Sequence, residues 1–247
     1  ALLVRVADCR EHGPYISRRI EEVRPAPSAN MIVTIDGPAG SGKSTAARGL
    51  ARRLGFEYLD TGAMYRAVAL ALTRADVPFC NAGRVVEFLA RTRLEMPAGQ
   101  VLLNGVDVSD AIRHPSISDA SSRVAVEPHV RAVLVQWQRQ VAQGRDMVCE
   151  GRDQGSVVFT DSPCKFFLTA PVETRAARRL EELRARGSHT TLEAMIEDIR
   201  IRDHRDATRA VGPLMRPDNA IVIDTTGLTA EQVLDRLEAE VRRCRPG

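Results

Sequence analysis

Short apolar segments alternate with amphipathic stretches through most of the chain after residue 30. Four of these segments are largely apolar and typical of buried strands: residues 31–35, 147–149, 164–168 and 220–223. Apolar residues recur at helical spacing from Ser44 to Leu54, and Gly55 follows as a helix stop. This alternation predicts an α/β fold in which helices cover both faces of a parallel sheet.

One region interrupts the alternation with short strand-like segments between residues 93 and 108. Pro97-Ala98-Gly99 separates the first two segments, and Asn104-Gly105, a strong hairpin signal, separates the last two. We therefore expect a small antiparallel insert at about residues 84–116.

A second exception is an arginine-rich helix predicted from Val172 to Arg186, which ends at Gly187-Ser188-His189. The next helix is predicted to begin with Thr190 and Glu193 at capping-box spacing. A helix pair joined at a glycine is typical of a mobile flap over a phosphate site, so we expect a lid at about residues 175–190.

Residues 1–30 differ from the rest because they are polar and end in a Pro-, Ala- and Ser-containing linker composition. The sequence thus predicts an N-terminal extension over 1–30 and one folded domain over 31–247. Met31 opens the first predicted strand, and we expect it to be at or near the true start. The first residues lack the apolar core of a signal peptide, and five scattered cysteines lack metal or disulfide spacing, which favours reduced thiols in the cytoplasm.

Composition and charge exclude several classes of protein. The formal net charge is only +3 and aromatic residues make up 4% of the chain, so neither a strong field nor stacking platforms indicate a nucleic-acid partner. No apolar run approaches the length of a membrane span, so we expect no membrane partner. We expect a monomer whose ligands are small molecules.

One motif carries a specific chemical prediction. Its residues fit G-x-x-x-x-G-K-[ST] between a predicted strand and a predicted helix: Gly37, Pro38, Ala39, Gly40, Ser41, Gly42, Lys43 and Ser44, with Thr45 following. Such a loop turns backbone N–H groups toward nucleotide phosphates at a helix N-terminus. Lys43 is expected to reach the β- and γ-phosphates of ATP, and the Ser44 hydroxyl to ligate Mg²⁺.

The remaining residues must distinguish among phosphate-loop classes. A switch GTPase needs an N-K-x-D segment, but the two lysines, Lys43 and Lys165, do not follow asparagine. Nine arginines fall within residues 175–209, and Arg202, Asp206 and Arg209 have the spacing of one helix face. Charge pattern alone favours an ion-paired solvated face, whereas a kinase of a phosphorylated acceptor would use such arginines to neutralise phosphates.

Five motifs decide between these two interpretations. They are Ile35-Asp36-Gly37-Pro38, Leu59-Asp60-Thr61-Gly62-Ala63-Met64-Tyr65-Arg66, Glu150-Gly151-Arg152-Asp153, Val157-Val158-Phe159 and Arg202-Asp203-His204-Arg205-Asp206. With these motifs the chain resembles the bacterial cytidylate kinases, which are phosphate-loop nucleoside-monophosphate kinases, from about Met31 to Val241. Gln154 and the N-terminal extension depart from the family pattern.

The resemblance implies transfer of the γ-phosphoryl group of MgATP to CMP or dCMP by direct in-line displacement. It places Arg66 and Thr61 at the acceptor phosphate and assigns reading of cytosine to Ser122, Arg131 and Asp153. It places further residues at the acceptor sugar and the phosphates: Arg152, Arg202, Asp206 and Arg209. Arg178 and Arg179 are expected over ATP from the lid, so that Lys43, Arg152, Arg178, Arg179 and Arg209 form the expected catalytic set.

Three of these residues also have a purely structural interpretation. Thr61 could cap a helix, Ser122 could be a packed hydroxyl, and Glu150 could be structural instead of organising the metal. Two rival functions also stay open at this point: a kinase for another small acceptor, such as UMP and CMP jointly or shikimate, and a nucleotide-dependent binding protein without an acceptor site.

Overall fold

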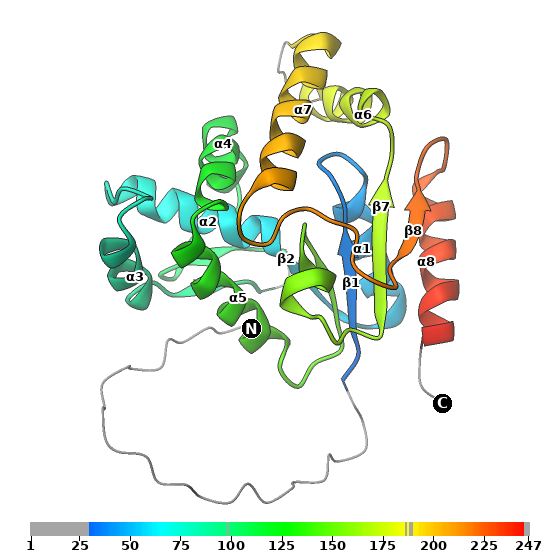
Figure 1. Ribbon diagram of the computed structural model, residues 1–247, viewed down its shortest axis with the longest axis horizontal. Helices are drawn as coiled ribbons and strands as arrows, with labels where there is room; N and C mark the ends of the chain where they lie inside the picture. The colour runs from blue at the N-terminus through cyan, green and yellow to red at the C-terminus, as the bar shows by residue number, and fades with distance from the viewer. Residues whose placement is uncertain (1–29, 98, 186, 188–189, 245–247) are drawn as a thin grey trace, which may run out of the picture.

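The computed structural model describes residues 30–97, 99–185, 187 and 190–244. Five strands form the central sheet: β1 (Ile32–Asp36), β2 (Glu57–Asp60), β6 (Met147–Glu150), β7 (Cys164–Thr169) and β8 (Ile221–Asp224). Their order is β2-β6-β1-β7-β8, and every neighbouring pair is parallel. This sheet confirms the predicted α/β fold and puts β1 at its centre (Figure 1).

Helices cover both faces of the sheet because side chains alternate along each strand. On one face, α1 (Lys43–Leu54) and α8 (Ala230–Cys244) share a core with Val33 and Ile35 of β1. On the other, α2 (Thr61–Arg74) and α5 (Pro128–Ala142) pack with apolar residues of β6. Thr34 and Asp36 alternate with Val33 and Ile35, so these two polar side chains point toward the α2 and α5 face.

The predicted antiparallel insert is present in the described residues, with shorter strands than expected. It consists of β3 (Leu94–Glu95), β4 (Leu102–Leu103) and β5 (Val106–Asp107). Asn104 and Gly105 both have positive φ, 51° and 82°, which is the backbone that a two-residue hairpin turn requires. Around it lie α3 (Ala82–Ala90), a short 3₁₀ turn (Ala111–Arg113) and α4 (Pro115–Val124).

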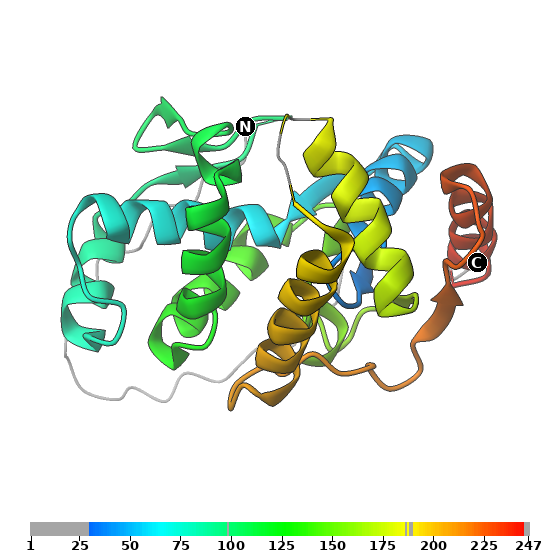
Figure 2. The same ribbon diagram turned by 90° about the horizontal axis from the view of Figure 1, so that it is seen from above.

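Two further helices, α6 (Val172–Arg184) and α7 (Leu192–Thr208), lie across the edge of the sheet where β1 ends (Figures 1 and 2). They form their own small core from Ala176, Met195 and Ile199. Ile199 and Met195 belong to the apolar face that helical spacing indicates for α7.

Three details of the predicted helix pair are wrong. α6 ends at Arg184 instead of Arg186, which lies outside the described residues. The N-cap of α7 is Thr191, whose hydroxyl accepts from the Ala194 amide at 3.2 Å, and not Thr190. Arg209 follows the helix in an extended conformation, so it does not share a helix face with Arg202.

The proposed extension falls almost wholly within residues 1–29, outside the described residues. Among the described helices, none is long and apolar enough to cross a membrane.

Candidate active site

A glycine-rich loop connects the central strand β1 to the N-terminus of α1. Gly37 has φ +147°, and a Cβ there would lie 2.0 Å from the carbonyl oxygen of Leu168, so only glycine fits between the strands. Gly42 caps α1 with a left-handed backbone at φ 86°. These two glycines let the loop fold tightly at the carboxyl edge of the sheet, in front of the positive end of the α1 dipole.

The loop lysine is buried and faces other cations. Lys43 donates from Nζ to the Pro38 carbonyl at 2.6 Å and lies 3.4 Å from the Ser41 hydroxyl. Burial, followed by the charge of Arg152, holds the pKa of Lys43 well below its usual range. A group of buried positive charges that depress one another is stabilised by a bound polyanion, and the loop is built to receive one.

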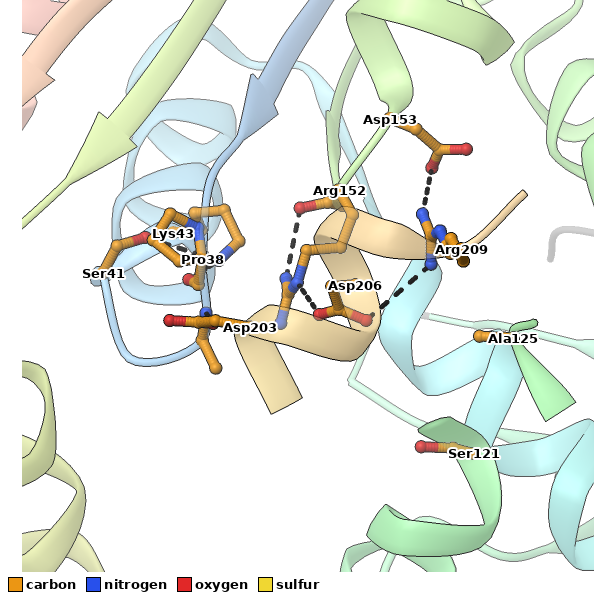
Figure 3. A network of polar contacts seen from close by, with 12 residues as sticks. Pro38, Ser41, Lys43, Ser121, Ala125, Arg152, Asp153, Asp203, Asp206 and Arg209 are labelled. Carbon is orange, nitrogen blue, oxygen red and sulfur yellow. Dashed lines mark hydrogen bonds and ion pairs between the residues drawn. The ribbon is translucent and has the colours of Figure 1, made fainter. Parts of the chain in front are cut away.

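Arg152 lies between the phosphate loop and the end of α7 (Figure 3). Its Nε is 2.9 Å from Oδ2 of Asp206, and Arg209 approaches the other oxygen of that carboxylate at 3.9 Å. Burial alone would raise the pKa of Asp206, but the charges of Arg152, Arg202 and Arg209 outweigh it and the pKa is lowered. The structure thus brings these four predicted residues together around one carboxylate.

Arg202 is the arginine of this group with a markedly lowered pKa. Burial, followed by Arg152, lowers the pKa of Arg202 to about 10, and Arg66 and Arg179 add to the effect. Its Nε has no hydrogen-bond partner among the described residues. A guanidinium whose Nε is buried without a hydrogen-bond partner is energetically costly, and an anionic ligand would satisfy that donor.

Two of the three residues expected to read the base, Arg131 and Asp153, are in direct contact. Arg131 and Asp153 form a buried ion pair through Nη2 and Oδ2, with 1% and 3% of each residue exposed. Arg209 stands 3.7 Å from the second oxygen of Asp153. Ser122 is buried as well, and within the described part of the chain its hydroxyl has no hydrogen-bond partner.

Thr61 and Arg66 lie at the start of α2, beside β6. The Thr61 hydroxyl donates to the Glu150 carbonyl at 2.6 Å, while Asp60 is the helix cap and accepts from the Ala63 amide at 2.7 Å. The interpretation of Thr61 as a helix cap is therefore wrong. Arg66 is 3.5 Å from the Asp60 carboxylate through Nη2, and its buried Nε is unpaired in the described structure.

Ser44 and Glu150 form the oxygen-rich side of the phosphate loop. Glu150 accepts from the Tyr58 hydroxyl at 2.6 Å. Burial, followed by the charge of Asp60, raises the pKa of Glu150, and hydrogen bonds from Ser44 and Tyr58 oppose this. A hydroxyl next to carboxylate oxygens is a donor set suited to Mg²⁺, which takes few protein ligands and keeps water and phosphate oxygens.

Arg178 and Arg179, the two arginines expected in the lid, differ in their contacts. Arg178 donates to both the hydroxyl and the carbonyl of Thr225, at 2.9 and 2.7 Å, so it fastens α6 to the loop after β8. The Thr225 hydroxyl in turn lies 3.4 Å from the Ser41 carbonyl of the phosphate loop. Arg179 pairs with exposed Glu182 at 2.8 Å.

Sequence reasoning missed a buried contact that joins α6 and α7 to the phosphate loop. Arg175, 7% exposed, donates to the carbonyls of Ala39 and Ala170 at 2.9 and 2.8 Å and pairs with Asp203. The other oxygen of Asp203 accepts from the Ala39 amide at 3.3 Å. Arg175 belongs to the arginine-rich segment and Asp203 to a quoted motif, but nothing in their spacing points to Ala39.

The parallel sheet and the glycine-rich loop between β1 and α1 define a phosphate-loop protein, and buried arginines face that loop. Within that class, residues 33–243 match the family model described as cytidylate kinase. The chain belongs to the cytidylate kinase family.

Curated relatives agree with this assignment. Cytidylate kinase of Caldanaerobacter subterraneus subsp. tengcongensis is 46% identical over 85% of this chain and 94% of its own length. The enzyme of the same name from Geobacter sulfurreducens is 45% identical over 88% and 96%. A solved structure, TT1252 from Thermus thermophilus, aligns with 89% of this chain and 100% of its own length, at 19% identity and a TM-score of 0.46.

Proposed function

We propose that this chain transfers the γ-phosphoryl group of ATP to CMP or dCMP, giving ADP and the nucleoside diphosphate. The observation that carries the proposal is the buried ion pair of Arg131 with Asp153, and the buried Ser122 hydroxyl, which has no partner among the described residues, adds to it. Cytosine offers an N4 amine that needs an acceptor, and O2 and N3 atoms that need donors. A carboxylate with a guanidinium and a hydroxyl provides that set, whereas uracil presents a carbonyl at the same position.

The acceptor phosphate is proposed to occupy the space between Arg66, Arg152 and Arg202. All three are partly buried cations, and the Nε atoms of Arg66 and Arg202 are unpaired among the described residues. Arg209 lies with Arg152 on Asp206, next to the base site. In this proposal positive charge lies on both sides of the transferred group, and such charge neutralisation is the main task of a protein in phosphoryl transfer.

On the donor side, the phosphates of ATP are proposed to lie in the loop from Gly37 to Ser44, with Thr45 behind it. Lys43 would leave its contact with the Pro38 carbonyl to reach the β- and γ-phosphates. Ser44, beside Glu150, would hold Mg²⁺, which neutralises charge on the transferring group when bound. Arg178 and Arg179 of α6 are proposed to close over the nucleotide and exclude water.

No general base is required in this scheme because a phosphate monoester is largely ionised near neutral pH. The chain's contribution is to align the two phosphates and to neutralise their charges. Thr61, whose hydroxyl is held by the Glu150 carbonyl, is proposed to fix the start of α2 and thus the place of Arg66.

The function is tested by coupled measurement of ADP release with MgATP and, separately, CMP, dCMP, UMP, AMP and shikimate. Turnover with CMP and dCMP far above the other acceptors is expected. Preferential turnover with shikimate would make the chain a kinase of another small acceptor. ATP binding with no acceptor-dependent ADP release would make it a nucleotide-dependent binding protein.

A further inference from the structure

Asp36 is a buried carboxylate that the proposed chemistry does not use. It is the last residue of β1, directly before the phosphate loop, and is 0% exposed. It points to the sheet face opposite α1, away from the loop helix. Its two oxygens accept from the backbone amides of Gln154 and Gly155, each at 2.8 Å.

Those two amides belong to the segment that carries the acceptor-site residues. Arg152 and Asp153 immediately precede Gln154, where a short π-helical turn (Gln154–Val158) begins. The two residues that Asp36 contacts therefore directly follow Arg152 and Asp153, the residues proposed to bind the phosphate and the base. The two backbone N–H groups at the start of the turn therefore both donate to the Asp36 carboxylate.

Helix α5 holds the same segment from the other side. Arg131 pairs with Asp153, and the buried Gln138, two helical turns further along, accepts from the side-chain amide of Gln154 at 3.2 Å. Arg139 donates to the carbonyls of Val157 and Val158 at 3.0 and 2.9 Å. The segment from Arg152 to Val158 is thus fixed between α5 and the end of β1.

We propose that Asp36 is a positioning residue for the acceptor: it sets the places of Arg152 and Asp153 from the strand that also carries the phosphate loop. The inference rests on the proposed function. Through Asp36, one strand end determines the position of the donor phosphates on its loop side and of the acceptor on its other side. Alignment of two phosphates for in-line transfer depends on such a shared frame.

A carboxylate is the group that this geometry requires. Two parallel N–H donors need two acceptor oxygens, and aspartate provides them on one short side chain. Asparagine has the same shape but one acceptor oxygen, so its NH₂ group would face one of the two amides. Burial raises the pKa of Asp36 to about 7, and the hydrogen bonds from the two amides recover only part of the cost of keeping the carboxylate charged.

The experiment compares Asp36→Asn with Thr34→Val. Thr34 lies two residues earlier on the same strand face, is equally buried, and its hydroxyl has no partner in the described structure, which makes it the matched control. In Asp36→Asn we expect KM for CMP to rise about tenfold, the loss expected for one hydrogen bond to a charged group, with Kd for ATP unchanged. Thr34→Val is expected to leave both constants unchanged.

Two results would overturn the inference. One is an unchanged KM for CMP in folded Asp36→Asn; the other is an equal loss of affinity for ATP and CMP, which would give Asp36 a general structural role. An absence of CMP turnover in the unsubstituted protein would instead reject the proposed function. The two failures are therefore distinguishable.

A second variant covers the case in which Asp36→Asn does not fold. A Cβ at Gly155 would lie 2.9 Å from the Thr34 hydroxyl and 3.0 Å from Pro217 Cγ, so Gly155→Ala crowds the segment beside Asp36, and we expect it to displace that segment. The same selective rise in KM for CMP is expected. An unaltered KM in Gly155→Ala would count against the proposal.

Discussion

Nη1 of Arg175 lies 2.6 Å from Oδ2 of Asp203 and also donates to the carbonyl of Ala39, so one guanidinium joins α6 and α7 to the phosphate loop. The contact is nearly buried, with 8% and 21% of the two side chains exposed. It makes the position of α6 and α7 depend on the loop that would bind ATP.

Asp203→Asn should therefore weaken ATP binding more than CMP binding. The change removes the ion pair and leaves the buried Arg175 charge uncompensated, at a cost of about 3 kcal/mol in the free energy of unfolding. KM for each substrate and Tm are the measurements. The matched control is Glu173→Gln, which breaks an exposed α6–α7 pair at 3.8 Å and should leave all three values unchanged. Equal effects of the two variants would contradict the role given to Arg175.

Loss of the Asp153 carboxylate should relax base selection. Asp153→Ala removes the acceptor proposed for the cytosine amine and leaves the buried Arg131 without its partner. The ratio of kcat/KM for CMP to that for UMP is expected to fall at least tenfold, in line with the loss of a charged hydrogen bond, while Kd for ATP stays unchanged. Unchanged discrimination between CMP and UMP would contradict the assignment.

Two adjacent serines give a sharper comparison. Ser122 has a buried hydroxyl with no partner among the described residues, whereas the Ser121 hydroxyl donates to the Ser118 carbonyl at 2.8 Å. Ser122→Ala should raise KM for CMP about fivefold, the loss of one neutral hydrogen bond, without lowering Tm. Ser121→Ala should leave KM unchanged. Equal KM values in the two variants would make Ser122 a packed hydroxyl.

The buried Asp36 predicts a pH dependence of stability. Its pKa is raised in the folded protein to about 7 from 3.8, so between these values the folded state holds a proton that the unfolded state has released. The contribution of Asp36 to the free energy of unfolding therefore falls as pH rises through this window, by about 4 kcal/mol, and is constant above it.

Asp36→Asn cannot titrate and lacks this contribution. Urea unfolding of both proteins between about pH 4 and about pH 8 should show the difference in unfolding free energy, unsubstituted minus variant, declining with pH and levelling off above about pH 7. A difference that is constant with pH would show that Asp36 ionises in the folded state as it does in the unfolded chain.

The sequence by itself determined four of the five described strands of the sheet, the phosphate loop and the insert, but not the edge strand β2. Strand hydrophobicity, the Gly37–Ser44 spacing and the Asn104-Gly105 turn are local signals, because each depends on residues a few positions apart. The resemblance also indicated which arginines and acids to examine, and the structure gathers Arg152, Arg202, Asp206 and Arg209 at one place.

Only the tertiary structure decided how those residues are held. The contact of Asp36 with Gly155 spans 119 positions, and that of Arg175 with Ala39 spans 136, and no periodicity connects such distant residues. The structure also shows that Arg209 lies after the end of α7 and that the N-cap of α2 is Asp60, not Thr61. Long-range hydrogen bonds form because buried polar groups must find partners wherever packing places them, and packing is a property of the whole chain.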